Sequence, residues 1–178
     1  MSPALPIASL WWREVVRFAR QRSRVTGALG QPLLFWILLG AGLGASFRAG
    51  DGAGAAAGAG YLEYAFPGTC VLVLLFTAIF STISVIEDRR EGFLQAVLVA
   101  PVPRSTIVLA KVLGGTTLAV AQALLFLAVA PLVGIPLSAA SLAASIALLT
   151  PIAFALTGLG FVFAWGVDST AGCPAIMS

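Results

Sequence analysis

The chain has 178 residues, of which 60% are hydrophobic and 10% are charged, with a formal net charge of +3. Globular proteins in water carry about 25% charged residues, so this chain has too few to cover a core with a polar surface. The absence of histidine excludes Ser-His-Asp catalysis and histidine-ligated metal sites. The single lysine, Lys111, is followed by valine, so the sequence lacks the Gly-Lys-Ser/Thr ending of a P-loop. The composition indicates a membrane protein without an ATPase motif of its own.

Residues 1–24 are expected to form a cytoplasmic amphipathic helix that lies in the membrane interface. Arginines recur at spacings of 4, 3 and 4 residues, which places them on one face of a helix: Arg13, Arg17, Arg20 and Arg24. We expect this face to meet anionic lipid headgroups, with Trp11 and Trp12 at headgroup depth. Membrane orientation accounts for these arginines, so binding to nucleic acid is not expected.

Four membrane spans are predicted from long stretches without charge, because about 20 apolar residues cross a bilayer as a helix. Residues 25–47 and 64–86 are two such stretches, and 112–167 is a longer one that Pro131 and Pro136 divide. The fold class is therefore all-α, a polytopic membrane helix bundle. The predicted spans lie near residues 25–47, 64–86, 106–130 and 139–165.

The basic residues predict the orientation of the bundle. Nine of the ten lie before the first span or within residues 87–111, counting Lys111 in the first turns of the third span, and the positive-inside rule places these segments in the cytoplasm. The N-terminus is then cytoplasmic, and the expected location is the plasma membrane, or the inner membrane of a cell that has two. Lys111, near the start of the third span, is expected to extend its stem to the headgroups.

The cytoplasmic connection over residues 87–104 differs from a short polar loop. Five charged residues lead through Gly92 into apolar residues at helical spacing, before two prolines stop the helix. The apolar positions are Phe93, Leu94, Val97 and Leu98, and the prolines are Pro101 and Pro103. Such a short amphipathic helix suits either the lipid surface or a groove in a soluble partner.

The same connection carries a family resemblance. Glu91-Gly-Phe-Leu-Gln95, then Leu98-Val-Ala-Pro-Val-Pro-Arg104 and Lys111, resembles the cytoplasmic signature of ABC transporter permeases of the type 2 exporter family. Gln31-Pro-Leu-Leu-Phe-Trp36, which opens the first span, and Asp168-Ser-Thr with Ala175-Ile-Met177 are similar to the family in order. Members usually have six spans, so by this resemblance the chain stops after four, and residues 171–178 begin an incomplete fifth.

The resemblance implies that residues 25–178 form the permease domain of an exporter, with ATP and magnesium bound by a separate ATP-binding subunit. A second permease would complete a homodimer or heterodimer, and the apolar spans would suit a lipophilic or lipid-linked substrate. The chain itself would hold no metal or cofactor and would catalyse no reaction. The alternative is a small four-helix membrane anchor or assembly protein without energy coupling. The implied coupling helix to the ATPase partner comprises Glu91, Gly92, Phe93, Leu94, Val97, Leu98, Pro101 and Arg104.

Overall fold

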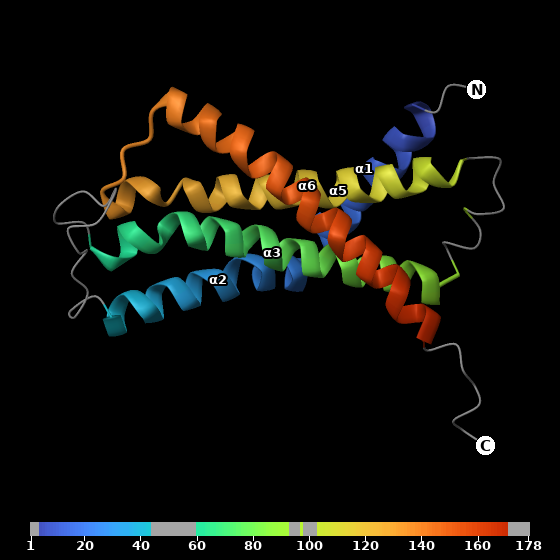
Figure 1. The fold of residues 1–178 in the computed structure, drawn as a ribbon, viewed down its shortest axis with the longest axis horizontal. Helices are drawn as coiled ribbons and strands as arrows, with labels where there is room; N and C mark the ends of the chain where they lie inside the picture. The colour runs from blue at the N-terminus through green and yellow to red at the C-terminus, as the bar shows by residue number, and fades with distance from the viewer. Residues whose placement is uncertain (1–3, 44–59, 93–96, 98–102, 171–178) are drawn as a thin grey trace, which may run out of the picture.

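The computed structural model describes residues 4–43, 60–92, 97 and 103–170 (Figure 1). These ranges are almost entirely helical and contain no strand, which confirms the all-α prediction. The helices are α1 (Ala4–Arg20), α2 (Arg22–Leu43), α3 (Tyr61–Arg90), α5 (Arg104–Leu127), the short 3-10 helix η1 (Ala130–Val133) and α6 (Ala139–Thr170).

Four helical segments in the described ranges are long and apolar enough to cross a membrane, as predicted: Arg22–Gly42, Tyr61–Arg90, Arg104–Val133 and Ala139–Trp165. The first begins nearer the N-terminus than residue 25, because the chain breaks its helix at Gln21 and resumes it at once. The second runs past both ends of 64–86, because Glu and Arg are good helix formers and continue the helix into the charged sequence. The charge gap over 64–86 therefore locates the apolar part of the second span and underestimates the helix around it.

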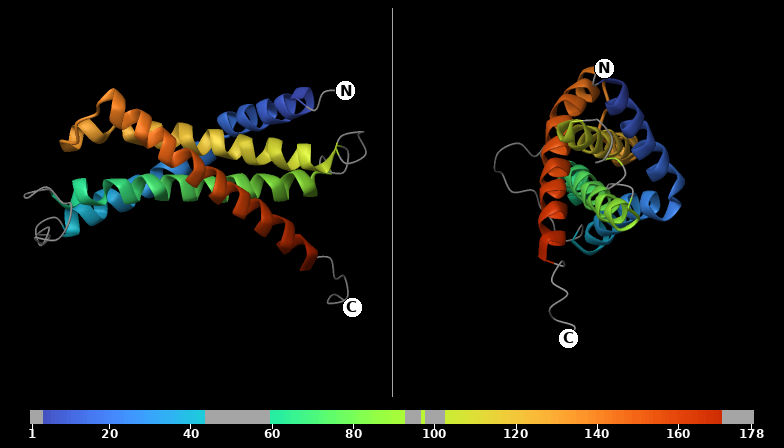
Figure 2. Two further views of the ribbon diagram at one scale, coloured as in Figure 1. Left: turned by 45° about the horizontal axis from the view of Figure 1, so that its top comes forward. Right: turned by 90° about the vertical axis from the view of Figure 1, so that its right-hand side faces the viewer.

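Helices α3 and α5 form the centre of the bundle. Figure 2 shows α6 crossing one side of this pair and α1 with α2 on the other side. The apolar windows of α3 and α5 are 44% and 39% buried, whereas those of α2 and α6 are 17% buried. Large apolar side chains of the outer helices, such as Leu38 and Val162, are consequently exposed. In a bilayer these faces meet lipid tails, which are as apolar as leucine.

The core is densest around three aromatic rings from three helices. Trp36 of α2 meets Phe66 of α3 and Phe126 of α5 edge-on, with ring centroids 5.6 Å apart in both pairs. Phe66 and Phe126 stack with centroids 4.8 Å apart. Because lipid provides no hydrophobic drive between spans, such close packing is a main source of helix association. The tryptophan Nε1–H donates to the Leu62 carbonyl at 3.1 Å, so its one polar group is satisfied.

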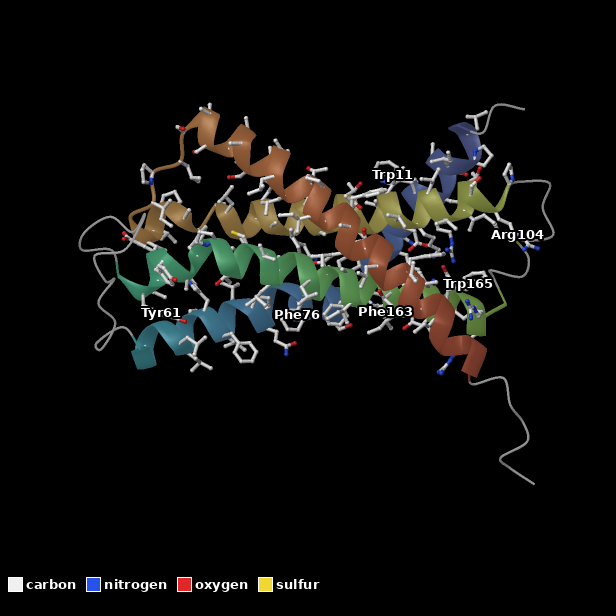
Figure 3. The ribbon with its side chains drawn as sticks, in the orientation of Figure 1. Trp11, Tyr61, Phe76, Arg104, Phe163 and Trp165 are labelled. Atoms are coloured by element: carbon white, nitrogen blue, oxygen red, sulfur yellow. The ribbon has the colours of Figure 1, made fainter. Side chains whose placement is uncertain are left out.

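The helix ends fall into two groups, as four crossings require. The N-terminus, the end of α3, the start of α5 and the end of α6 lie at one end of the bundle (Figure 1). The end of α2, the start of α3 and η1 lie at the other. Figure 3 places Arg104 and Trp165 at the first end and Tyr61 at the second. This grouping is the one that four crossings predict, and the cytoplasmic side of the first end stays a prediction.

Candidate functional site

A cluster of charged side chains joins α1, α2, α3 and α5 where α3 ends. Its members, called here the charge cluster, are Arg13, Glu14, Arg17, Arg24, Glu87, Asp88, Glu91 and Lys111. Four cations face four carboxylates, so the charges balance. This balance matters because charges removed from water need partners of opposite sign.

Asp88 is at the centre of the charge cluster and is fully buried. The guanidinium of Arg13 donates to both of its carboxylate oxygens, at 3.1 and 3.3 Å. Arg17 Nη1 and Lys111 Nζ donate to the same carboxylate. One aspartate of α3 thus holds cations from α1 and from α5.

Lys111 forms a second ion pair with Glu14 of α1. The hydroxyl of Ser84 donates to the other oxygen of that glutamate at 3.3 Å. Lys111 is 6% exposed, so the expectation that its stem extends to the headgroups is wrong. Lys111 lies about 10 Å from the start of α5, at the level of the Glu14 and Asp88 carboxylates. Ion pairs with these carboxylates replace the hydration that the ammonium would have among the headgroups.

The approach of α1 to α5 depends on a glycine. A Cβ on Gly114 would lie 2.9 Å from the Glu14 Cβ and 3.9 Å from the Trp11 carbonyl oxygen. The absence of a side chain at this position therefore lets Glu14 reach Lys111. One turn further along α5, Trp11 Nε1 donates to Thr117 Oγ1 at 3.0 Å and fixes α1 at a second point.

Arginines of the N-terminal stripe do not all point where the sequence suggested. Arg13 and Arg17 turn towards α3, and Arg24, in the first turn of α2, pairs with Glu87. The sequence suggested lipid headgroups as the partners of these three, whereas in the structure they pair with carboxylates of α3, of which only Asp88 is fully buried. Arg20 is exposed. The position of α1 in the membrane interface stays a prediction.

The rim of the charge cluster is where the predicted coupling segment starts. Arg17 Nη2 lies 3.3 Å from both Glu87 Oε2 and Glu91 Oε2, and Glu91 is the residue that follows α3. The next residue, Gly92, has φ +75°, a backbone conformation that favours glycine and ends the helix. The backbone conformation of Gly92 therefore sets the direction in which the chain leaves α3, and the ion pair with Arg17 fixes Glu91 just before it.

Other predicted site residues are described only in part. Val97 is helical and half-buried, and Arg104 is exposed at the first turn of α5. Trp12 is 60% exposed. Three predicted apolar anchors and one proline expected to end the coupling helix lie outside the described residues: Phe93, Leu94, Leu98 and Pro101. The predicted start of a fifth span at 171–178 also lies outside them.

Sequence reasoning missed Glu14 and the pairing of Lys111 with Asp88. Two signals point to them. Glu14 is the only acid in an otherwise arginine-rich helix, and Lys111 is followed closely by Gly114, which admits a neighbouring helix. Among the described residues, no group of three His, Cys, Asp or Glu side chains is placed to hold a metal ion.

Comparison with protein families supports the resemblance found in the sequence. Residues 6–172 match the family model described as ABC-2 type transporter. Comparison with curated proteins and with solved structures gives no match. The matched region includes all but the first two residues of α1, the four candidate spans and the connection between α3 and α5. The chain therefore belongs to the ABC-2 type transporter family and is a multi-pass permease subunit of an ABC-type transporter.

Proposed function

We propose that this permease works in an exporter in which a separate ATPase subunit docks on residues 91–104 and the charge cluster carries its movement to the spans. The observation that supports the proposal is the position of the cluster. Glu91 is both a member of the cluster and the first residue of the segment. Movement of a partner bound to residues 91–104 would thus be transmitted through Glu91 to the charge cluster.

The charge cluster suits such a relay because its pairs are costly to break. Asp88 and Lys111 are almost completely buried, and removing one partner of a buried pair costs about 3–5 kcal/mol. Displacement of the end of α3 should then carry α1 and α5 with it as one body. Helix α6 packs on this body, since Arg89 of α3 lies 4.6 Å over the Trp165 ring and Thr116 of α5 is 3.0 Å from the Thr157 hydroxyl, so the movement would also reach α6.

The partners and substrate follow from the family. Membership implies an ATP-binding subunit, and we propose that this subunit holds ATP and magnesium and that a second permease chain completes the complex. We propose a lipophilic or lipid-linked substrate, which the uniformly apolar spans would suit. The basic residues at the end of α3 and in α1 support a cytoplasmic N-terminus in the plasma membrane.

Docking is tested by co-purification of the permease with its cognate ATPase. Phe93→Asp and Leu94→Asp should abolish co-purification, because each places a charge at an expected apolar anchor. Leu132→Asp is the matched control, since Leu132 is 85% exposed in η1 at the opposite end of the bundle. If the two anchor variants retain the ATPase as well as the control does, docking at this segment is refuted. A four-helix anchor without energy coupling would retain no ATPase even as the unaltered chain.

The relay is tested separately from docking. Arg17→Gln removes the cation shared by Glu87, Asp88 and Glu91, and we expect it to keep the ATPase bound while lowering transport per ATP hydrolysed. Arg20 lies three residues further along α1 and its side chain is exposed, so Arg20→Gln should change neither ATPase binding nor transport per ATP hydrolysed. Equal coupling ratios in the two variants would refute the relay and leave the docking proposal standing.

A further inference from the structure

A small cavity lies between α3, α5 and α6, beside the charge cluster. Its polar wall consists of Ser81 and Thr82 from α3, Lys111 from α5 and Thr157 from α6. The space open to the centre of a water molecule is about 10 Å³. A water needs on the order of 10–15 Å³ by this measure, so the cavity has room for one water and for nothing larger.

The wall offers hydrogen bonds that the protein itself does not use. An ammonium has three N–H groups, and that of Lys111 donates hydrogen bonds to Glu14 and Asp88. The Ser81 hydroxyl forms no hydrogen bond within the described part of the chain. The Thr82 hydroxyl donates to the Ala78 carbonyl at 2.9 Å and keeps its oxygen as an acceptor. These groups make up the two to four partners that a buried water has.

The charges around the cavity favour a neutral water molecule over an ion. Lys111 is a lining residue, and its ammonium repels any cation. Its charge is already matched by Glu14 and Asp88, so no excess positive charge is left to hold an anion. We propose that the cavity binds one ordered water molecule, which accepts a hydrogen bond from Lys111 and exchanges one with the Ser81 hydroxyl.

This water has two structural consequences. It completes the solvation of a buried ammonium, whose unused N–H would otherwise cost free energy. It also links the charge cluster to the interface of α3 with α6. Gly115 of α5 lets Ser81 and Thr157 approach next to this space, because a Cβ there would lie 2.5 Å from the Ser81 Oγ and 3.0 Å from the Thr157 Cγ2.

The single lysine makes a selective experiment possible. Uniform ¹⁵N labelling of the full chain, reconstituted in lipid, gives one lysine side-chain ammonium signal in solid-state NMR, alongside the signals of the backbone amides. We expect magnetisation to pass from water to Lys111 Nζ several-fold faster than to the backbone amide of Leu74, which is fully buried among apolar residues. Transfer to Nζ as slow as to Leu74 would overturn the proposal without any variant.

Two variants locate the water. Ser81→Val replaces the free hydroxyl with methyl groups that fill the cavity, and it should reduce the transfer to Lys111 Nζ several-fold. Thr77→Val is the matched control, because Thr77 is a buried hydroxyl residue one turn away on α3 that does not line the cavity. Unchanged transfer in Ser81→Val would show that the ammonium is hydrated from elsewhere and would contradict the proposed site.

Discussion

Neutralising Asp88 should destabilise the permease more than any other single charge change. The substitution Asp88→Asn keeps the shape of the side chain and removes the charge that Arg13, Arg17 and Lys111 share. Four cations then face three carboxylates. One positive charge is left without a partner in a site where the aspartate is fully buried.

The magnitude follows from how far the cations can reach water. Breaking a buried ion pair by removing one partner costs about 3–5 kcal/mol. The Arg13 side chain is 33% exposed and can turn outward, whereas Lys111 is 6% exposed and cannot. We therefore expect Asp88→Asn to lower the free energy of unfolding by about 3 kcal/mol, near the lower end of that range.

The assay is unfolding in mixed micelles by added SDS, followed by tryptophan fluorescence. Lys111→Met alone should also destabilise, but the double variant Asp88→Asn with Lys111→Met restores the charge balance. Its cost should be smaller than the sum of the single costs by about 1–3 kcal/mol. Additive single costs, or a loss below about 1 kcal/mol for Asp88→Asn, would refute the reasoning that these charges form one buried unit.

Two further predictions concern packing. Gly114→Val should displace α1 from α5, because its Cβ would lie 2.9 Å from the Glu14 Cβ. A disulfide designed between α1 and α5 should then form more slowly. Gly158→Ala, at a position with open space around the Cβ, should leave that rate unchanged. Phe126→Ala should cost about 2 kcal/mol in the SDS assay, roughly half the loss seen in water-soluble cores, because the bilayer removes the transfer contribution and leaves the cavity. Phe163→Ala, at a side chain that is 63% exposed, should cost less than about 0.5 kcal/mol, and equal losses at the two phenylalanines would contradict the placement of the core.

The number of spans could be predicted from the sequence because it depends on a local quantity. A stretch of about 20 uncharged residues has to cross a bilayer wherever its neighbours lie. Residues 64–86 and 139–165 therefore predicted α3 and α6 without reference to any contact. The extension of α3 through Arg90 was missed, because a charged helical turn and a charged loop have similar compositions.

The family was also accessible from the sequence, since its signature lies in one continuous segment between Glu91 and Lys111. The docking role of that segment stays a prediction, and four of its expected residues lie outside the described part of the chain. What the structure adds there is the anchoring of Glu91 by Arg17 and the backbone direction set by Gly92.

The sequence by itself determined that the chain is a membrane protein and where its spans lie, because both follow from where charges are absent along the chain. The sidedness that the basic residues favour stays a prediction. Only the tertiary structure decided which charges meet. Glu14 and Lys111 are 97 residues apart, and Lys111 and Asp88 are 23 apart, so their pairing depends on the rotation and depth of three separate helices. Those are set by side-chain packing and by the close approach at Gly114. Periodicity could place arginines on one face of α1, but whether that face met lipid or carboxylate was settled by the helix packed against it.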